Sequence, residues 1–97
     1  APILKEPLNG AQISLAALPG AQKKVFFTWA KTNYTEYYEY QISYDEQFSS
    51  IFLRGTQRDN FYVLTNPPQG KYFWRVRSRS KSMSSQFTSA LSFVISP

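Results

Sequence analysis

The sequence predicts an all-β fold of several short strands, arranged as a sandwich or a barrel. Aromatic residues make up 18% of the 97 residues, and these side chains suit the half-buried surface of a strand. Glycine and proline separate short segments in which apolar and polar residues mostly alternate. No segment carries the apolar stripe at positions i, i+3, i+4 and i+7 that an amphipathic helix needs. We therefore expect negligible helix.

Seven strands are expected between these turn signals. The first covers residues 3–8 and 11–15 and is interrupted by a turn at Asn9-Gly10. Pro2 and Pro7 confine it to a sheet edge, because proline cannot donate to the hydrogen bonds of a central strand. Polar residues 55–60 are expected to form a loop. The remaining strands are expected at residues 25–30, 37–44, 51–54, 61–65, 71–80 and 87–95.

Alternation within these strands assigns one face of each to the core. In residues 37–44 the inward set includes Tyr44, and in residues 71–80 it includes Ser78. The large apolar side chains on these faces form the expected core, which comprises Trp29, Tyr40, Ile42, Leu64, Tyr72, Trp74, Val76 and Phe93.

The opposite face of residues 71–80 carries the best functional signal in the sequence. Its outward side chains place positive charge at alternate positions, a geometry that suits an anionic polymer, and outward aromatic rings offer a platform for sugars or bases. The candidate binding surface comprises Tyr37, Phe73, Arg75, Arg77 and Arg79. The competing interpretation is structural: a neighbouring strand brings Glu39 across from the arginines, and arginine stems commonly cover sheet faces.

Composition excludes several kinds of chemistry. The chain has no cysteine and no histidine, so thiolate or imidazole nucleophile pairs and the usual zinc sites cannot form. Apart from Glu6 in the first, edge strand, only Glu39 among the six carboxylates lies within an expected strand. We expect no cofactor, no metal and no enzymatic activity. The net charge of +5 attracts anionic surfaces only weakly and is modest beside that of a dedicated nucleic-acid binder, so nucleic acid is not the expected partner. No apolar run is long enough to span a membrane.

Three stretches resemble one known family, the fibronectin type III domains. Residues 64–78, LTNPPQGKYFWRVRS, are similar to the corner between the fifth and sixth strands of that family. Phe27-Thr28-Trp29 resembles its second strand, and the run from Tyr38 to Asp45 followed by Phe48 resembles its third strand in bacterial extracytoplasmic versions. The resemblance implies a seven-stranded, two-sheet antiparallel sandwich of immunoglobulin-like type. It also implies that the Tyr72 hydroxyl bonds back to the backbone near the turn.

The same resemblance implies a function only in general terms, because these motifs serve packing. We expect residues 1–97 to be one domain excised from a larger extracytoplasmic protein of the periplasm, cell envelope or secreted space. Its expected role is spacing neighbouring domains of the same polypeptide, or binding a protein or glycan. Two alternatives stay open. One is binding of an anionic polymer (acidic polysaccharide, cell-wall glycan or nucleic acid) through Arg75, Arg77 and Arg79, and the other is service as an accessory domain of an enzyme whose catalytic part lies elsewhere.

Overall fold

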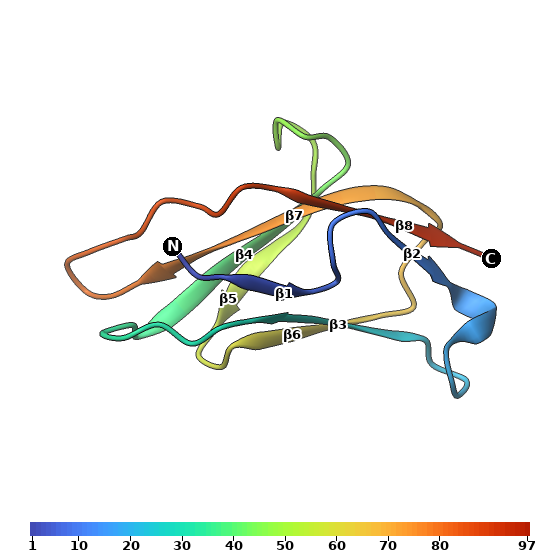
Figure 1. Cartoon of the computed structure of the whole chain (residues 1–97), viewed down its shortest axis with the longest axis horizontal. Helices are drawn as coiled ribbons and strands as arrows, with labels where there is room; N and C mark the ends of the chain where they lie inside the picture. Colours follow the sequence, from blue (N-terminus) through green and yellow to red (C-terminus); the bar gives the residue numbers. More distant parts are fainter.

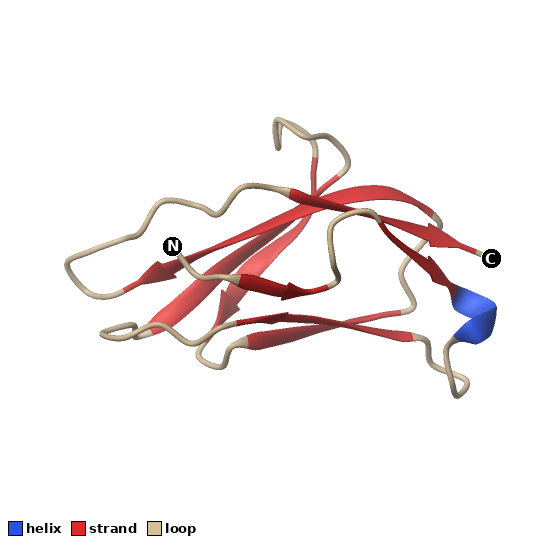
Figure 2. Ribbon diagram, in the orientation of Figure 1, coloured by secondary structure: helices blue, strands red, loops and turns tan.

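The computed structural model describes residues 1–97 and forms two β-sheets packed face to face (Figures 1 and 2). The smaller sheet has the order β1-β3-β6 and the larger the order β2-β8-β7-β4-β5. The helix content is a single 3₁₀ turn, Leu15–Ala17. The predicted fold class, an all-β sandwich, is confirmed. The strands are β1 (Leu4–Glu6), β2 (Ala11–Ser14), β3 (Lys24–Trp29), β4 (Tyr37–Ser43), β5 (Ile51–Gln57), β6 (Phe61–Thr65), β7 (Gly70–Arg79) and β8 (Leu91–Ser96).

The first predicted strand is in fact two strands that belong to different sheets. β1 pairs antiparallel with β3, whereas β2 pairs parallel with β8. The turn at Asn9-Gly10 carries the chain from the smaller sheet to the larger one. Gly10 has a φ of 79°, and its N–H donates to the Ser92 carbonyl. Asn9 Oδ1 accepts from the Ser92 N–H at 2.9 Å. The count is therefore eight strands, with one parallel pair, where seven antiparallel strands were predicted. Both β1 and β2 lie at sheet edges, as the prolines require.

Among the other strands, two boundaries differ from the prediction by more than one residue. β5 continues through Gly55 to Gln57, because Gly55 pairs with Tyr40 of β4 and gives the tyrosine ring room. β8 begins at Leu91 rather than at residue 87. The preceding residues follow β7 through isolated hydrogen bonds only, among them Thr88 N–H to the Val76 carbonyl at 2.9 Å.

The core lies between the two sheets and consists of one cluster of twelve buried apolar residues. All eight side chains assigned to the core from the sequence are buried, with Trp29, Trp74, Val76 and Phe93 at 0% exposure. Ser78 is half-buried. Tyr44 is 51% exposed, contrary to its predicted inward position. The register between β4 and β5 shifts at Ile42 and Ser43, and a shift of this kind breaks the alternation on which the prediction rested.

The corner between β6 and β7 is closed by a side chain. The Tyr72 hydroxyl donates to the Pro68 carbonyl at 2.8 Å, the bond that the family resemblance implies. Because β6 and β7 belong to different sheets, this bond fixes the connection between the two layers of the sandwich.

Candidate functional site

The outer face of β4 and β7 brings the three predicted arginines together. They occupy alternate positions of β7, about 6.8 Å apart. In the sheet register Arg75 faces Gln41, Arg77 faces Glu39 and Arg79 faces Tyr37. We call this surface the arginine face; its members are Arg75, Arg77 and Arg79 of β7 with Tyr37, Glu39 and Gln41 of β4.

Glu39 is the carboxylate at the centre of the arginine face. Its Oε1 accepts hydrogen bonds from Arg77 Nε at 3.1 Å, Arg77 Nη2 at 3.0 Å and Arg79 Nη1 at 3.0 Å. Partial burial acts to raise the pKa of Glu39, but the hydrogen bonds and charges of Arg79 and Arg77 outweigh it and hold that pKa below its ordinary value. One carboxylate thus pairs with two guanidinium groups.

Arg75 is enclosed more fully than its two neighbours. Its guanidinium carbon lies 4.0 Å from the centre of the Phe48 ring and 4.1 Å from that of Phe87. Its Nε and Nη2 both donate to Gln41 Oε1, at 2.9 and 2.7 Å. Burial, together with the nearby charge of Arg77, lowers the pKa of Arg75. This side chain therefore bridges two segments outside the strands, those that carry Phe48 and Phe87, through cation–π contacts.

The two predicted aromatic members of the surface lie far apart. Tyr37 faces Arg79 at one end of β7, and its ring centre lies 5.9 Å from that guanidinium carbon. Phe73 faces Ser43, about 20 Å along the strand at the usual rise per residue. Lys71 Nζ lies over the Phe73 ring at 5.5 Å. The structure therefore does not bring Tyr37 and Phe73 into one aromatic platform.

A polar pocket of about 700 Å³ opens beside Tyr37 at the far end of β5. Side chains of different chemistry surround it: the Glu36 carboxylate, the Arg58 guanidinium, the Gln57 amide and the Thr56 hydroxyl. Sequence alternation could not identify this pocket, because Glu36 and Arg58 lie outside the strands and meet only through the pairing of β4 with β5.

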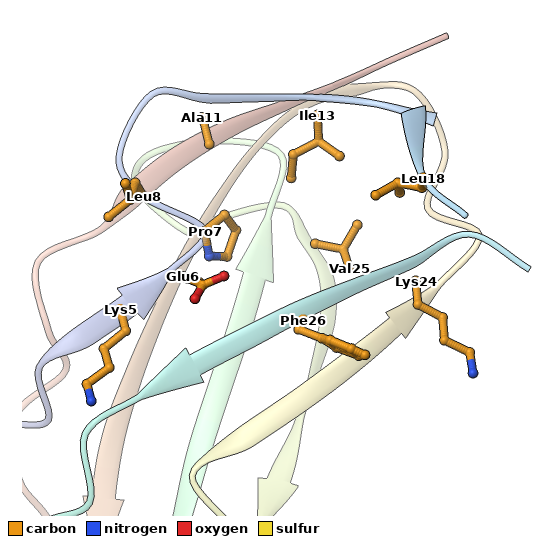
Figure 3. Close-up of a pocket in the computed structure, with 10 residues that line it drawn as sticks. All are labelled: Lys5, Glu6, Pro7, Leu8, Ala11, Ile13, Leu18, Lys24, Val25 and Phe26. Carbon is orange, nitrogen blue, oxygen red and sulfur yellow. The ribbon is translucent and has the colours of Figure 1, made fainter. Parts of the chain in front are cut away.

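A second surface, which the sequence analysis did not single out, is apolar. On the outer face of the smaller sheet Phe26 is 48% exposed and Phe61 43% exposed, with Val63 opposite Phe26 in the register. Phe26 also lines a pocket of about 680 Å³ at the crossing from β1 to β2. In Figure 3 the side chains of Ile13 and Val25 point into this pocket. One feature of the sequence could have indicated this apolar surface, namely the aromatic side chain of Phe26 on the outward face of residues 25–30.

No three residues of the metal-binding types His, Cys, Asp and Glu gather closely enough to hold a metal ion. None of the helical segments has the length and apolar character needed to cross a membrane.

Comparison with known proteins identifies the fold. No protein-family model matches the chain, and no curated protein matches it in sequence. Solved structures do match. The crystal structure of FN3tt superimposes with a TM-score of 0.64 at 22% identity, over 98% of this chain and 95% of FN3tt. The structure of an FN3tt mutant gives a TM-score of 0.59 at 20% identity, over 89% and 93% of the two chains.

The chain has the fibronectin type III fold. At this level of identity the similarity shows the architecture alone. The fibronectin type III resemblance of residues 64–78 is thus confirmed for the fold, and the bacterial extracytoplasmic version of the family stays a prediction.

Proposed function

We propose that this fibronectin type III domain is a non-catalytic interaction and spacer module of a larger extracytoplasmic protein. The observation that carries the proposal is the position of the chain ends. The domain measures 43 × 28 × 18 Å, and the two termini lie toward opposite ends of its longest axis (Figure 1). A domain joined at each terminus would therefore extend the chain lengthwise. Fibronectin type III domains are generally non-catalytic, which agrees with this role.

The strands at the two ends give such a spacer firm attachment points. β1 is hydrogen-bonded to β3 in the smaller sheet, and β8 lies between β2 and β7 in the larger one. Ser14 Oγ donates to the Pro97 carbonyl at 2.7 Å. Neighbouring domains of the same polypeptide would thus be held through both sheets.

Small-angle scattering of two copies joined head to tail, Pro97 to Ala1, tests the spacer role. We expect a maximum dimension approaching twice the 43 Å length of one domain. The matched control is the same pair with a glycine-serine linker inserted, which behaves as a flexible coil and broadens the distance distribution. A folded-back pair with the compact profile of side-by-side domains would contradict the proposal.

The binding role is proposed for a protein or glycan at the polar pocket beside Tyr37. An aromatic ring next to a carboxylate, an amide and a guanidinium can stack on a sugar or side chain and hydrogen-bond to it. A glycan array probed with the parent and with Tyr37→Ala tests the glycan arm: binding lost in the variant supports it, and array signals equal for both proteins contradict it.

Anionic-polymer binding is the second candidate, and one observation favours it. The outer face of the larger sheet carries Arg54 beside the three arginines of β7, but Glu39 forms the only ion pairs there. A surplus of positive charge therefore remains on this face. Arg54 is exposed and forms no ion pair, and the side chain of Arg79, although paired with Glu39, is 37% exposed.

Heparin affinity at several salt concentrations tests this candidate. The variant Arg77→Ala/Arg79→Ala should bind more weakly than the parent and show a smaller salt dependence, because fewer counterions are released. The variant Lys24→Ala/Lys31→Ala removes the same charge elsewhere and serves as the control. Equal losses in the two double variants would show attraction to net charge rather than to this face.

A further inference from the structure

We propose that β5 is a docking edge, where an acidic, extended segment of another protein adds as a sixth strand to the larger sheet. This inference rests on the proposed interaction role and names the kind of partner. β5 is the last strand in the order β2-β8-β7-β4-β5, so one of its long sides has no neighbouring strand. Along that side, backbone N–H and C=O groups are unpaired and available.

The length of β5 distinguishes it from the other three edges. It has seven residues, whereas β1 has three, β2 four and β6 five. Natural edge strands are commonly kept short, interrupted by proline or protected by charged side chains, most often lysine. β5, with the sequence IFLRGTQ, has neither proline nor lysine. An edge of this length offers enough backbone groups for several intermolecular hydrogen bonds.

Most of β5 is also regular, which suits an added strand. From Leu53 to Gln57 its register with β4 is continuous, and the single irregularity lies toward the Ile51 end. The strand is supported from the inside at Gly55, over which the Tyr40 ring lies. That ring stacks on Tyr62 of the smaller sheet with ring centres 4.2 Å apart. The edge is therefore held in the extended form before a partner arrives, and less ordering entropy opposes binding.

Charge indicates which partner fits this edge. Arg54 is exposed in the middle of β5, and Arg58 is exposed directly after its end. Neither forms an ion pair, because both ion pairs of the protein belong to Glu39. A segment with carboxylates at alternate positions would pair with these guanidinium groups and gain specificity from them.

Titration with a synthetic strand tests the proposal. The probe is a blocked peptide of alternating valine and glutamate, followed by fluorescence anisotropy of an attached dye and by amide hydrogen exchange of the intact domain. We expect saturable binding that weakens as salt screens the charges, together with slower exchange confined to β5. Arg54→Ala and Arg58→Ala should each weaken binding several-fold, whereas the control Lys31→Ala leaves it unchanged.

Two N-methylated versions of the peptide separate strand addition from simple charge attraction. In a strand pair, alternate N–H groups point toward the partner and the others away from it. Methylation of one alternate set should therefore abolish binding, and methylation of the other set should spare it. Equal affinity of the two methylated peptides would overturn the proposal, as would exchange protection on β6 or on the arginine face.

Two further outcomes identify the occupant and keep this inference separate from the spacer role. Concentration-dependent self-association with β5 protection and no peptide binding would mean that a second copy of the chain, not an acidic partner, occupies the edge, which overturns the proposal. Failure of the peptide to bind overturns the docking edge while head-to-tail scattering still reports on the spacer role.

Discussion

Replacement of Gly55 by alanine tests how closely the two sheets are joined at the β5 edge. Gly55 lies opposite Tyr40, and an added Cβ would sit 2.6 Å from the Tyr40 hydroxyl oxygen and 2.9 Å from the ring carbon that carries it. Atoms do not pack this closely, so the ring would have to move. The backbone conformation of Gly55 permits alanine, because Gly55 is not among the glycines with positive φ.

The change in unfolding free energy depends on the contacts that hold the Tyr40 ring in place. Tyr40 is 7% exposed and stacks on Tyr62, so movement costs that aromatic contact and disturbs the core. Overpacking of this kind destabilises proteins by about 1–3 kcal/mol. Replacement of a glycine by alanine, where alanine can adopt the same conformation, stabilises the folded protein by about 0.4–1 kcal/mol, because it restricts the unfolded chain. We therefore expect a net loss of about 1–2 kcal/mol in unfolding free energy.

Urea unfolding followed by tryptophan fluorescence measures this change, since Trp29 and Trp74 are both fully buried. The decisive comparison uses a Tyr40→Leu background, in which the ring is gone. There Gly55→Ala should change sign and stabilise by up to about 1 kcal/mol. An equal loss in both backgrounds, or no loss in the parent, would refute the reasoning that the Tyr40 ring sets the requirement for glycine.

Three further predictions concern the core, a turn and the corner. Trp29→Ala should cost about 3–5 kcal/mol, as large aromatic truncations in cores do, whereas Arg77→Ala should cost under about 1 kcal/mol because its ion pair is partly exposed. Asp45→Asn should destabilise at neutral pH but progressively less as the pH falls, since hydrogen bonds from the serines of its own turn hold the pKa of Asp45 well below 3.8. Tyr72→Phe should cost about 0.5–1.5 kcal/mol through loss of the bond to the Pro68 carbonyl.

Urea titrations at several pH values provide all three measurements. For Asp45 the sign follows from a lowered folded-state pKa. The stabilisation is present above the ordinary pKa of 3.8 and is lost progressively below it, because the unfolded carboxylate takes up a proton there while the folded one stays ionised. A constant difference between parent and Asn variant across this range would contradict the assignment. Tyr44→Phe, at an exposed ring, is the control for Tyr72 and should be neutral. A larger cost for Arg77→Ala than for Trp29→Ala would mean that the faces of the sheets are inverted.

The period-two pattern of the sequence was sufficient for the core but not for the edges. Inside a strand each side chain alternates strictly, so Trp74 and Val76 could be assigned inward from the pattern of β7 alone. Strand ends depend on contacts from other segments. Gly55 was predicted to lie in a loop because glycine is rare inside strands. Its place in β5 is explained by the Tyr40 ring, which lies against it and leaves no room for a side chain.

The sequence pattern predicted which way the three arginines of the candidate surface point, but not the contacts that each of them makes. Alternation placed Arg75, Arg77 and Arg79 on one outer face, which the register with β4 bears out. The same pattern could not distinguish a binding surface from a structural one, since both require outward arginines. The rings of Phe48 and Phe87 contact the Arg75 guanidinium and hold it in the structure. Both residues lie outside the strands, so no alternating pattern could indicate these contacts.

These contacts divide the arginine face into two parts with different consequences. Arg75 connects the loop that carries Phe48 with the segment that carries Phe87, so its removal should loosen both connections whatever the domain binds. Arg79 lies at the other end, and its side chain is 37% exposed. A ligand with a negative charge would therefore engage the Arg79 end first, next to Tyr37 and the polar pocket at the end of β5. The positive charge and the open strand edge thus meet at the same end of the larger sheet, which favours a partner that is both extended and acidic.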